Sequence, residues 1–127
     1  MKNRNVRKTF LIIDDDRIFC DAVRDHLSGG VEVIVANTAA EGISACAQRR
    51  VDVVLLDQQL PDAEGHTLCP SILKHNNDTK IIFATAYPSF DNAVKALKGG
   101  AHDYLTKPFE RERLKTTVRK GLEMAAL

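Results

Sequence analysis

The stretch VDVVLLDQQLP, residues 51–61, runs from a block of apolar residues directly into a carboxylate. Four consecutive apolar residues, 53–56, lead into Asp57, and a proline follows at position 61. A continuous apolar run of this length is typical of a parallel strand that is covered on both faces. A lone aspartate after such a strand is most simply interpreted as a solvated turn residue. The rest of the sequence favours a different interpretation.

Four other short runs have the character of strands. They are TFLII at 9–13, VEVIVA at 31–36, KIIFA at 80–84 and HDYLT at 102–106. Between them lie segments whose apolar residues recur at helical spacing. The stripes are Phe19, Val23 and Leu27; Ala40, Ile43 and Ala47; Leu68 and Ile72; Phe90, Val94 and Leu97; and Leu114, Val118 and Leu122. Strand and helix thus alternate five times, which predicts an α/β fold with a parallel sheet and right-handed crossovers.

Composition excludes several classes of protein. The chain has 127 residues, 44% hydrophobic and 28% charged, with a net charge of +1, so it fits one ordinary globular domain and not a strongly basic nucleic-acid binder. The three cysteines are widely spaced and the four histidines lack metal-ligand spacing, which favours a reducing compartment without a disulfide framework or a zinc site. The apolar run at 10–13 is too short to enter a membrane, so we expect a cytoplasmic protein.

Polar residues collect where the predicted strands end. Asp14, Asp15 and Asp16 follow the run at 9–13, Asp57 follows 51–56, Thr85 follows 80–84 and Lys107 follows 102–106. Carboxyl ends of parallel strands share one edge, and open α/β sheets bind ligands at that edge, where the strand order reverses. In the strand order 2-1-3-4-5, Asp57 faces Asp14 and Asp15. Asp16 is most simply interpreted as the N-cap residue of the first helix.

Clustered carboxylates repel one another unless a pKa rises or a cation neutralises them. An all-oxygen cluster suits Mg²⁺, which keeps coordination positions open for phosphate oxygens. Lys107 adds a fixed positive charge and Thr85 a hydroxyl. These are the parts needed for phosphoryl transfer, in which positioning and charge neutralisation dominate, and a carboxylate can itself accept the phosphoryl group.

Four motifs then carry a resemblance to a known family. LIIDDD at 11–16, VDVVLLDQQLPDAEG at 51–65, IIFATAY at 81–87 and GGAHDYLTKPF at 99–109 occur in order. The sequence resembles the receiver domain of two-component response regulators over about residues 8–124. The resemblance implies a flavodoxin-like, doubly wound (βα)5 sheet in the order 2-1-3-4-5. It also implies that residues 1–127 are a single receiver domain, with the effector domain outside this chain.

The resemblance assigns roles at the acidic site. Asp57 matches the phosphoacceptor. Asp15 matches the direct ligand of Mg²⁺, and Asp14 matches the neighbouring acid that usually holds metal-bound water. The backbone carbonyl of Gln59 matches the third protein ligand of the metal.

Further roles follow from the same resemblance. Thr85 matches the hydroxyl residue that moves to bond the phosphoryl group, and Lys107 matches the lysine that contacts a phosphoryl oxygen. Tyr104 matches the switch aromatic that follows the state of Thr85. The bond between Lys107 and Pro108 is usually cis in this family.

The resemblance also implies partners. A sensor histidine kinase would supply the phosphoryl group, and the chain itself would catalyse only its own phosphorylation and dephosphorylation. The segment 84–114 is most similar to receivers of σ54-dependent transcriptional activators. We therefore expect control of transcription, a homodimer formed through the fourth helix, the strand at 102–106 and the last helix, and no direct contact of this domain with nucleic acid.

Two residues beside the site predict a slow loss of the phosphoryl group. Gln59 lies two positions after the acceptor, and Tyr87 lies two after Thr85. The amide of Gln59 can orient a water molecule but cannot take its proton, so general-base catalysis should be missing. The bulk of Tyr87 would keep water from the acyl phosphate.

Other functions stay open at this stage. A receiver-like interaction module that never takes phosphate would have the same fold. The Asp-x-Asp pair of Asp14 and Asp16 resembles the start of haloacid dehalogenase-type phosphatases, in which Asp14 would be the nucleophile and Asp16 the general acid. The chain is short for such an enzyme and lacks its later acidic metal motif.

Overall fold

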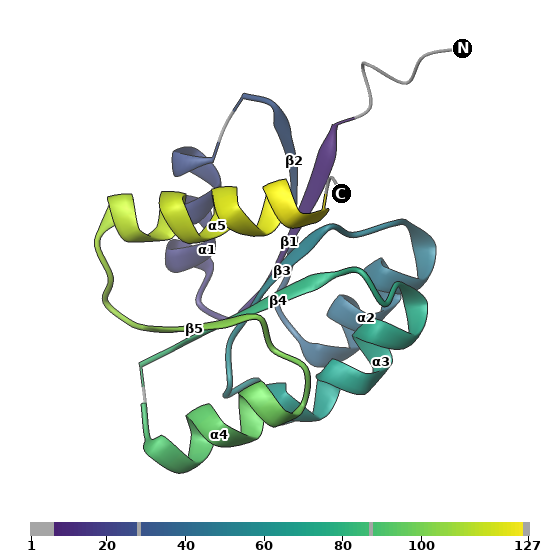
Figure 1. Cartoon of the computed structure of the whole chain (residues 1–127), viewed down its shortest axis with the longest axis vertical. Coiled ribbons are helices and arrows are strands. Elements are labelled where there is room, and N and C mark those ends of the chain that lie inside the picture. Colours follow the sequence, from purple (N-terminus) through teal and green to yellow (C-terminus); the bar gives the residue numbers. More distant parts are fainter. Residues whose placement is uncertain (1–6, 28, 87, 126–127) are drawn as a thin grey trace.

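A computed structural model describes residues 7–27, 29–86 and 88–125 (Figure 1). Five strands form one parallel sheet in the order β2-β1-β3-β4-β5, as the sequence predicts. The strands are β1 (Lys8–Ile13), β2 (Val31–Ala36), β3 (Val53–Leu56), β4 (Lys80–Thr85) and β5 (Asp103–Thr106). All four pairings are parallel, and each needs a crossover segment, which the helices supply.

Helices cover both faces of the sheet. They are α1 (Arg17–His26), α2 (Ala39–Gln48), α3 (Cys69–His75), α4 (Phe90–Lys98) and α5 (Arg111–Ala125), and a short 3-10 helix, η1 (Gly65–Leu68), leads into α3. Two hydrophobic clusters result. One joins α2, α3 and α4 to the sheet, and the other joins α1 and α5 to the opposite face. Figure 1 shows these two layers on either side of the strands.

The alternation of side chains along β1 explains both clusters. Leu11 and Ile13 belong to the cluster under α2, α3 and α4, whereas Phe10 and Ile12 belong to the one under α1 and α5. Successive side chains of a strand point to opposite faces, so a central strand buried on both sides must be apolar at every position. This constraint accounts for the unbroken apolar runs in the sequence.

The helix stripes are only partly as predicted. In α5, Leu114 and Val118 are buried as expected. In α2 the buried residues are Ala39, Gly42 and Cys46, one position earlier than the predicted stripe, because small residues pack closely there. In α4 the buried residue is Ala96, and Leu97 is exposed. Ile18 in α1 is apolar yet 84% exposed.

Helix starts are capped by side chains. Asp16 accepts a hydrogen bond from the Phe19 amide at 3.0 Å and so caps α1, as the sequence predicts. Thr38 caps α2 and Ser89 caps α4 in the same way. These caps fix where the chain turns from the carboxyl edge of the sheet into a helix.

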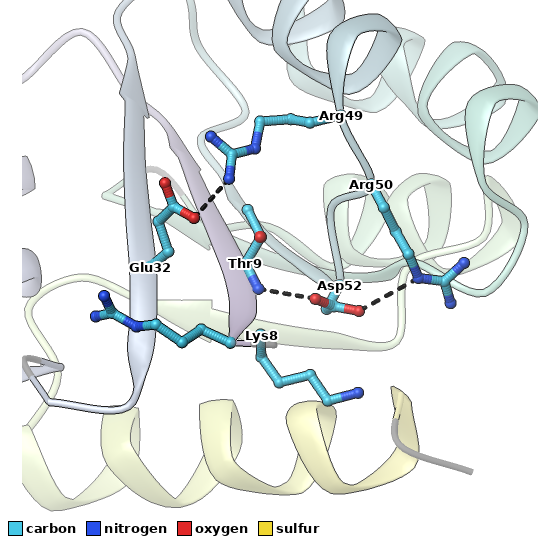
Figure 2. Close-up of a pocket in the computed structure, with 7 residues that line it drawn as sticks. Lys8, Thr9, Glu32, Arg49, Arg50 and Asp52 are labelled. Atoms are coloured by element: carbon cyan, nitrogen blue, oxygen red, sulfur yellow. Dashed lines mark hydrogen bonds and ion pairs between the residues drawn. The ribbon is translucent and has the colours of Figure 1, made fainter. Parts of the chain in front are cut away.

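The amino-terminal edge of the sheet holds a hollow of about 490 Å³ (Figure 2). Asp52 is buried there, accepts a hydrogen bond from the Thr9 amide at 2.7 Å, and pairs with Arg50 at 3.6 Å. Arg49 pairs with Glu32 at 2.5 Å. These contacts join the starts of β1, β2 and β3 at the edge opposite the predicted site.

Glycines follow two of the helices. Gly29 and Gly30 have positive φ values of 84° and 102° and make the turn into β2, after α1 has already ended at His26. After α4, only Gly100 is left-handed, with φ 112°, whereas Gly99 keeps an ordinary φ of −77°. A Cβ atom at Gly100 would also lie 2.7 Å from Cδ1 of Leu73.

No helix in the described ranges is long and apolar enough to cross a bilayer.

We expect Gly100→Ala to lower the free energy of unfolding by about 1–2 kcal/mol, since an L-residue is strained at that φ and the new methyl group meets Leu73. Gly99→Ala is the matched control, because its backbone is helical and the nearest contact of a Cβ atom, with the Lys95 carbonyl oxygen, is 3.2 Å. Urea unfolding of both variants measures the difference. Equal losses would show that the left-handed backbone is not the cause.

Candidate functional site

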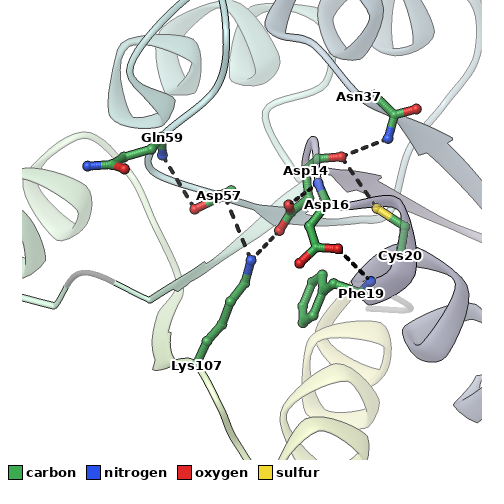
Figure 3. A network of polar contacts seen from close by, with 8 residues as sticks. All are labelled: Asp14, Asp16, Phe19, Cys20, Asn37, Asp57, Gln59 and Lys107. Atoms are coloured by element: carbon green, nitrogen blue, oxygen red, sulfur yellow. Dashed lines mark hydrogen bonds and ion pairs between the residues drawn. The ribbon is translucent and has the colours of Figure 1, made fainter.

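Three carboxylates meet at the carboxyl edge of the sheet. Figure 3 shows two of them, Asp14 and Asp57. Asp14 is buried, Asp15 is exposed and Asp57 lies between these extremes, and each offers one oxygen within 4.8 Å of the others. The register brings them together. Ile13 pairs with Leu56, and the Asp57 amide donates to the Ile13 carbonyl at 3.0 Å. They line a hollow of about 480 Å³ with Asp16, Gln59, Leu60, Pro61, Ala86 and Lys107.

Lys107 reaches this cluster from the loop after β5. Its Nζ donates to Oδ2 of Asp14 at 2.6 Å and lies 3.7 Å from Oδ2 of Asp57. The same ammonium lies 4.0 Å above the ring centroid of Phe19, a cation–π contact. The Lys107 amide donates to the Thr85 carbonyl at 2.8 Å, which ties the loop to the end of β4.

The backbone of Asp14 is held by several donors. Its carbonyl accepts from Nδ2 of Asn37 at 2.8 Å and from Sγ of Cys20 at 3.4 Å, and its carboxylate accepts from the Asp16 amide at 2.9 Å. The two side-chain donors come from the loop after β2 and from α1, as Figure 3 shows for the labelled residues. The turn after β1 is therefore fixed before any ligand arrives.

The loop after β3 is also tightly held. The side chain of Gln58 is buried and bonds His66 twice, from Nε2 to the ring Nδ1 at 2.8 Å and from the His66 amide to Oε1 at 3.1 Å. A Cβ atom at Gly65 would lie 2.1 Å from the Asp57 carbonyl oxygen, so only glycine fits there. Gln59 stands at the rim, with its amide 3.4 Å from Oδ1 of Asp57.

Asp62 connects that loop to α2. Its carboxylate accepts from the amides of Ala39 at 2.8 Å and Ala40 at 3.0 Å. These two bonds hold the pKa of the Asp62 carboxyl below its ordinary value. A negatively charged group at a helix N-terminus is favourable, so the contact stabilises both segments.

Burial raises the pKa of Asp57 to about 6, with the nearby Asp14 carboxylate acting in the same direction. Lys107 and the Gln59 amide oppose the shift, and Asp15 adds to it. The side chain of Asp57 is only 12% exposed. Three carboxylates against one ammonium leave excess negative charge, and the ligand atoms are all oxygens within reach of one another. This donor set fits a hard divalent cation such as Mg²⁺.

The other predicted residues are placed as follows. Thr85 is fully buried at the end of β4, and it is the next residue, Ala86, that lines the hollow. Tyr104 stacks on Phe83 with centroids 6.4 Å apart, and its buried hydroxyl has no hydrogen-bond partner among the described residues. The predicted cis bond between Lys107 and Pro108 is confirmed. Tyr87 lies outside the described residues.

The family model for the response regulator receiver domain matches residues 10–119. The chain belongs to this family. The receiver is 33% identical over 115 residues to the luminescence regulatory protein LuxO of Vibrio campbellii, covering 90% of this chain and 25% of LuxO. It is 34% identical over 113 residues to the transcriptional regulatory protein ZraR of Escherichia coli O157:H7, covering 88% of this chain and 26% of ZraR. These matches confirm the predicted similarity to receivers of σ54-dependent activators.

A solved structure agrees with the fold. A CheY-like receiver domain protein of Methanospirillum hungatei superposes with a TM-score of 0.90 at 33% identity, covering 95% of this receiver and 98% of that chain. The receiver spans about a quarter of the length of LuxO and ZraR. Family membership argues against the phosphatase alternative, as does Asp16, whose side chain caps α1.

Sequence reasoning missed the residues that hold this site in place. Asn37 lies outside the quoted motifs and bonds Asp14, which is 23 positions away. The contact between Gln58 and His66 depends on how the loop after β3 folds, which the motif at 51–65 does not reveal. Phe19 was recognised only as part of a helix stripe. Its contact with the Lys107 ammonium depends on the loop after β5 folding back over α1.

The pKa of Asp57 predicts how pH affects stability. A raised pKa means that the folded chain holds a proton between about pH 4 and 6 that the unfolded chain releases, so this carboxyl lowers stability as pH rises through that range. We expect Asp57→Asn to raise the free energy of unfolding by about 1–3 kcal/mol at pH 7.5 in EDTA, and to have little effect at pH 4. Urea unfolding at both pH values is the measurement. A stabilisation that does not depend on pH would show that ionisation of Asp57 is not responsible.

Proposed function

We propose that this receiver accepts a phosphoryl group from a sensor histidine kinase on Asp57, with Mg²⁺ bound at Asp14, Asp15, Asp57 and the Gln59 carbonyl. The observation that carries the proposal is the position of Asp57. It directly follows the buried strand β3 and lies beside two other acids, with the Lys107 ammonium 3.7 Å from its carboxylate. A surface aspartate in a turn would have neither neighbour.

The residues present supply most of the chemistry. Asp57 acts as the nucleophile in its ionised form, which dominates above its pKa of about 6. The Lys107 ammonium already forms ion pairs with the carboxylates of Asp14 and Asp57. It can therefore contact a phosphoryl oxygen that enters between them. Mg²⁺, when bound, would offset the negative charge of the incoming phosphoryl group. Positioning and charge neutralisation are the main catalytic terms in this class of reaction.

Thr85 and Tyr104 would then transmit the event. Thr85 ends β4 beside the hollow, and Tyr104 lies in β5 against Phe83, which is also in β4. The buried hydroxyl of Tyr104 lacks a hydrogen-bond partner among the described residues. An unpaired buried hydroxyl raises the free energy of this arrangement, so less free energy is needed to move the Tyr104 side chain to another position. Bonding of Thr85 to the phosphoryl group would bias the face formed by α4, β5 and α5, and that face would form a homodimer.

In this proposal the protein acts in a phosphorelay, and it does so in the cytoplasm. The similarity to LuxO and ZraR supports an output in transcription, exerted by a part that lies outside the receiver domain. The receiver itself would bind neither nucleic acid nor membrane. The remaining alternative is a receiver that binds partners without taking phosphate, and the experiments below separate the two.

Acetyl phosphate with Mg²⁺ should add one phosphate to the purified chain, and Asp57→Asn should abolish uptake. Asp15→Ala should fold, since it relieves repulsion between carboxylates. Its uptake should fall by more than the roughly 10–100-fold typical of lost outer-shell metal partners. Intact-mass spectrometry and melting temperature report both effects. Phosphate on Asp14, or no uptake by the wild type, would contradict the proposal.

Beryllofluoride, a mimic of the phosphoryl group, should shift the chain from monomer to dimer in sedimentation velocity. Thr85→Ala should weaken that shift, because the bond that drives the change is lost. Arg24→Ala is the control, since Arg24 lies on α1, away from the proposed face, and is half-exposed. An unchanged mass with bound beryllofluoride would refute the proposed dimer.

The phosphoryl group should persist for minutes to hours. Gln59 cannot act as a general base, and such help is typically worth about 10²–10⁴-fold. Gln59→Glu, which supplies a carboxylate at the same position, should shorten the lifetime, and Tyr87→Ala should do so if Tyr87 shields the acyl phosphate. Release of inorganic phosphate from purified phosphoprotein measures both. A wild-type half-life of seconds would overturn this prediction.

A further inference from the structure

A buried pair of hydrogen bonds joins the loop after β3 to the 3-10 helix η1. The side chain of Gln58 is only 4% exposed, and it contacts His66 at two points. Its Oε1 accepts from the His66 backbone amide at 3.1 Å, and its Nε2 lies 2.8 Å from the ring Nδ1. We call these two contacts the Gln58–His66 clasp. Neither residue lines the acidic hollow, so the roles proposed for the carboxylates leave the clasp unexplained.

The two contacts determine which nitrogen of the His66 ring carries a proton. Oε1 of Gln58 faces the backbone N–H of His66, so the atom that faces Nδ1 is the amide nitrogen, which can only donate. Nδ1 must therefore accept, and the ring is neutral. Turning the amide over does not accommodate a charged ring, because the amide nitrogen would then face the backbone N–H. Protonation of the ring thus costs one hydrogen bond at a buried amide.

The clasp lies at the base of the turn that presents Gln59. The Gly65 amide donates to the Gln58 carbonyl at 2.6 Å, so the backbone and the side chain of Gln58 are both bound to the start of η1. The next residue, Gln59, pairs with Glu64 in an isolated antiparallel bridge. The direction of the Gln59 peptide therefore depends on contacts on either side of it, and the clasp is the one that a proton can break.

The His66 ring has no ion-pair partner among the residues that the structure describes, and Gln58 is the residue bonded to it there. The 3-10 helix packs against α2 and α3. The titratable groups of these elements and of the loop are Asp57, Asp62, Glu64, Glu41, Cys46, Cys69, Lys74 and His75. Glu41 already accepts from the Asn37 amide, and Asp62 accepts from two amides at the start of α2. The clasp, and not an ion pair, is thus the contact through which a charge on His66 acts.

We propose that His66 is a positioning residue for the Mg²⁺ site, and that it holds the Gln59 carbonyl in place only while its ring is neutral. The inference rests on the proposed function, because that function assigns the Gln59 carbonyl to the metal. Histidine is the side chain whose charge ordinarily changes between about pH 5 and 8. As the pH falls through this range, a charged ring opens the clasp, the Gln59 peptide shifts, and Mg²⁺ binds more weakly. This loss adds to the loss caused by protonation of the carboxylates themselves.

The test compares the dissociation constant of Mg²⁺ at about pH 5.5 with that at about pH 8, which span the ordinary range of histidine. NMR of the ¹⁵N-labelled chain during titration with MgCl₂ gives both constants, and the measured quantity is the first divided by the second. Protonation of the carboxylates enters this quotient in every variant. His66→Asn places an amide oxygen near the position of Nδ1, so it keeps an acceptor for Gln58 that does not titrate. It should bind like the wild type at the higher pH, with a quotient roughly two- to tenfold smaller, as expected for one hydrogen bond.

Gln58→Leu separates the clasp from direct repulsion between a charged ring and the metal. It removes the clasp but leaves His66 free to titrate, so it should weaken binding at the higher pH and show the small quotient of His66→Asn. His75→Asn is the matched control, since His75 is an exposed histidine at the end of α3, and it should keep the wild-type quotient. Equal quotients for the wild type and His66→Asn, or a wild-type quotient in Gln58→Leu, would overturn the proposed role of His66. Failure of the wild type to bind Mg²⁺ at the higher pH would instead overturn the proposed function.

Discussion

One ion pair organises the acidic end of this molecule. The Lys107 ammonium, 2.6 Å from Asp14 and 3.7 Å from Asp57, is shared by two carboxylates that would otherwise repel each other at close range. Most of the local structure serves that arrangement. Asn37 and Cys20 hold the backbone of Asp14, Gln58 and His66 hold the loop after Asp57, and the Phe19 ring lies under the ammonium. Removing the lysine would leave buried negative charge without compensation.

The pair can form because of strand order. Asp14 and Asp57 are far apart in sequence, yet β1 and β3 are neighbours, and each ends at the same edge. Lys107 arrives from beyond β5, two strands away, on a loop tied to the end of β4. The apolar runs that bury the sheet on both faces therefore also set the distances among the charged groups. In this domain, the register of the strands determines both the packing of the core and the distances among the charged groups of the site.

Much of this could be predicted from the sequence, for physical reasons. A doubly covered strand must be apolar throughout, so the central strands β1, β3 and β4 stand out. The edge strands β2 and β5 carry polar residues and stand out less, and the strand order follows from the family's fold. The site residues stand out because they follow strands. Helix faces were harder. In α2, alanines, glycine and cysteine carry little contrast between faces, so the predicted stripe was one residue late. Leu97 is large and apolar yet exposed, and Ala96 takes the buried position in the core cluster under α2, α3 and α4.

The contacts that support the site were beyond prediction for another reason. The bond between Gln58 and His66 depends on how the loop after β3 folds into η1, and the contact of Lys107 with Phe19 depends on where the loop after β5 meets α1; no residue spacing predicts either. The raised pKa of Asp57 belongs to the same class of property. The sequence shows that acids will gather, but burial and the placement of Lys107 decide how much the carboxyl is shifted.

The hollow at the amino-terminal edge has a consequence for how the molecule approaches others. Arg7, Lys8, Arg49 and Arg50 outnumber Glu32 and Asp52 there, whereas acids dominate at the carboxyl edge. Although its net charge is only +1, the chain therefore presents opposite local charges at the two edges of its sheet. In the electric field of a charged surface, such a chain is rotated more strongly than it is attracted. A positively charged surface would turn its acidic end forward within a screening length, about 8 Å at physiological ionic strength, and added salt would shorten the reach of that orientation.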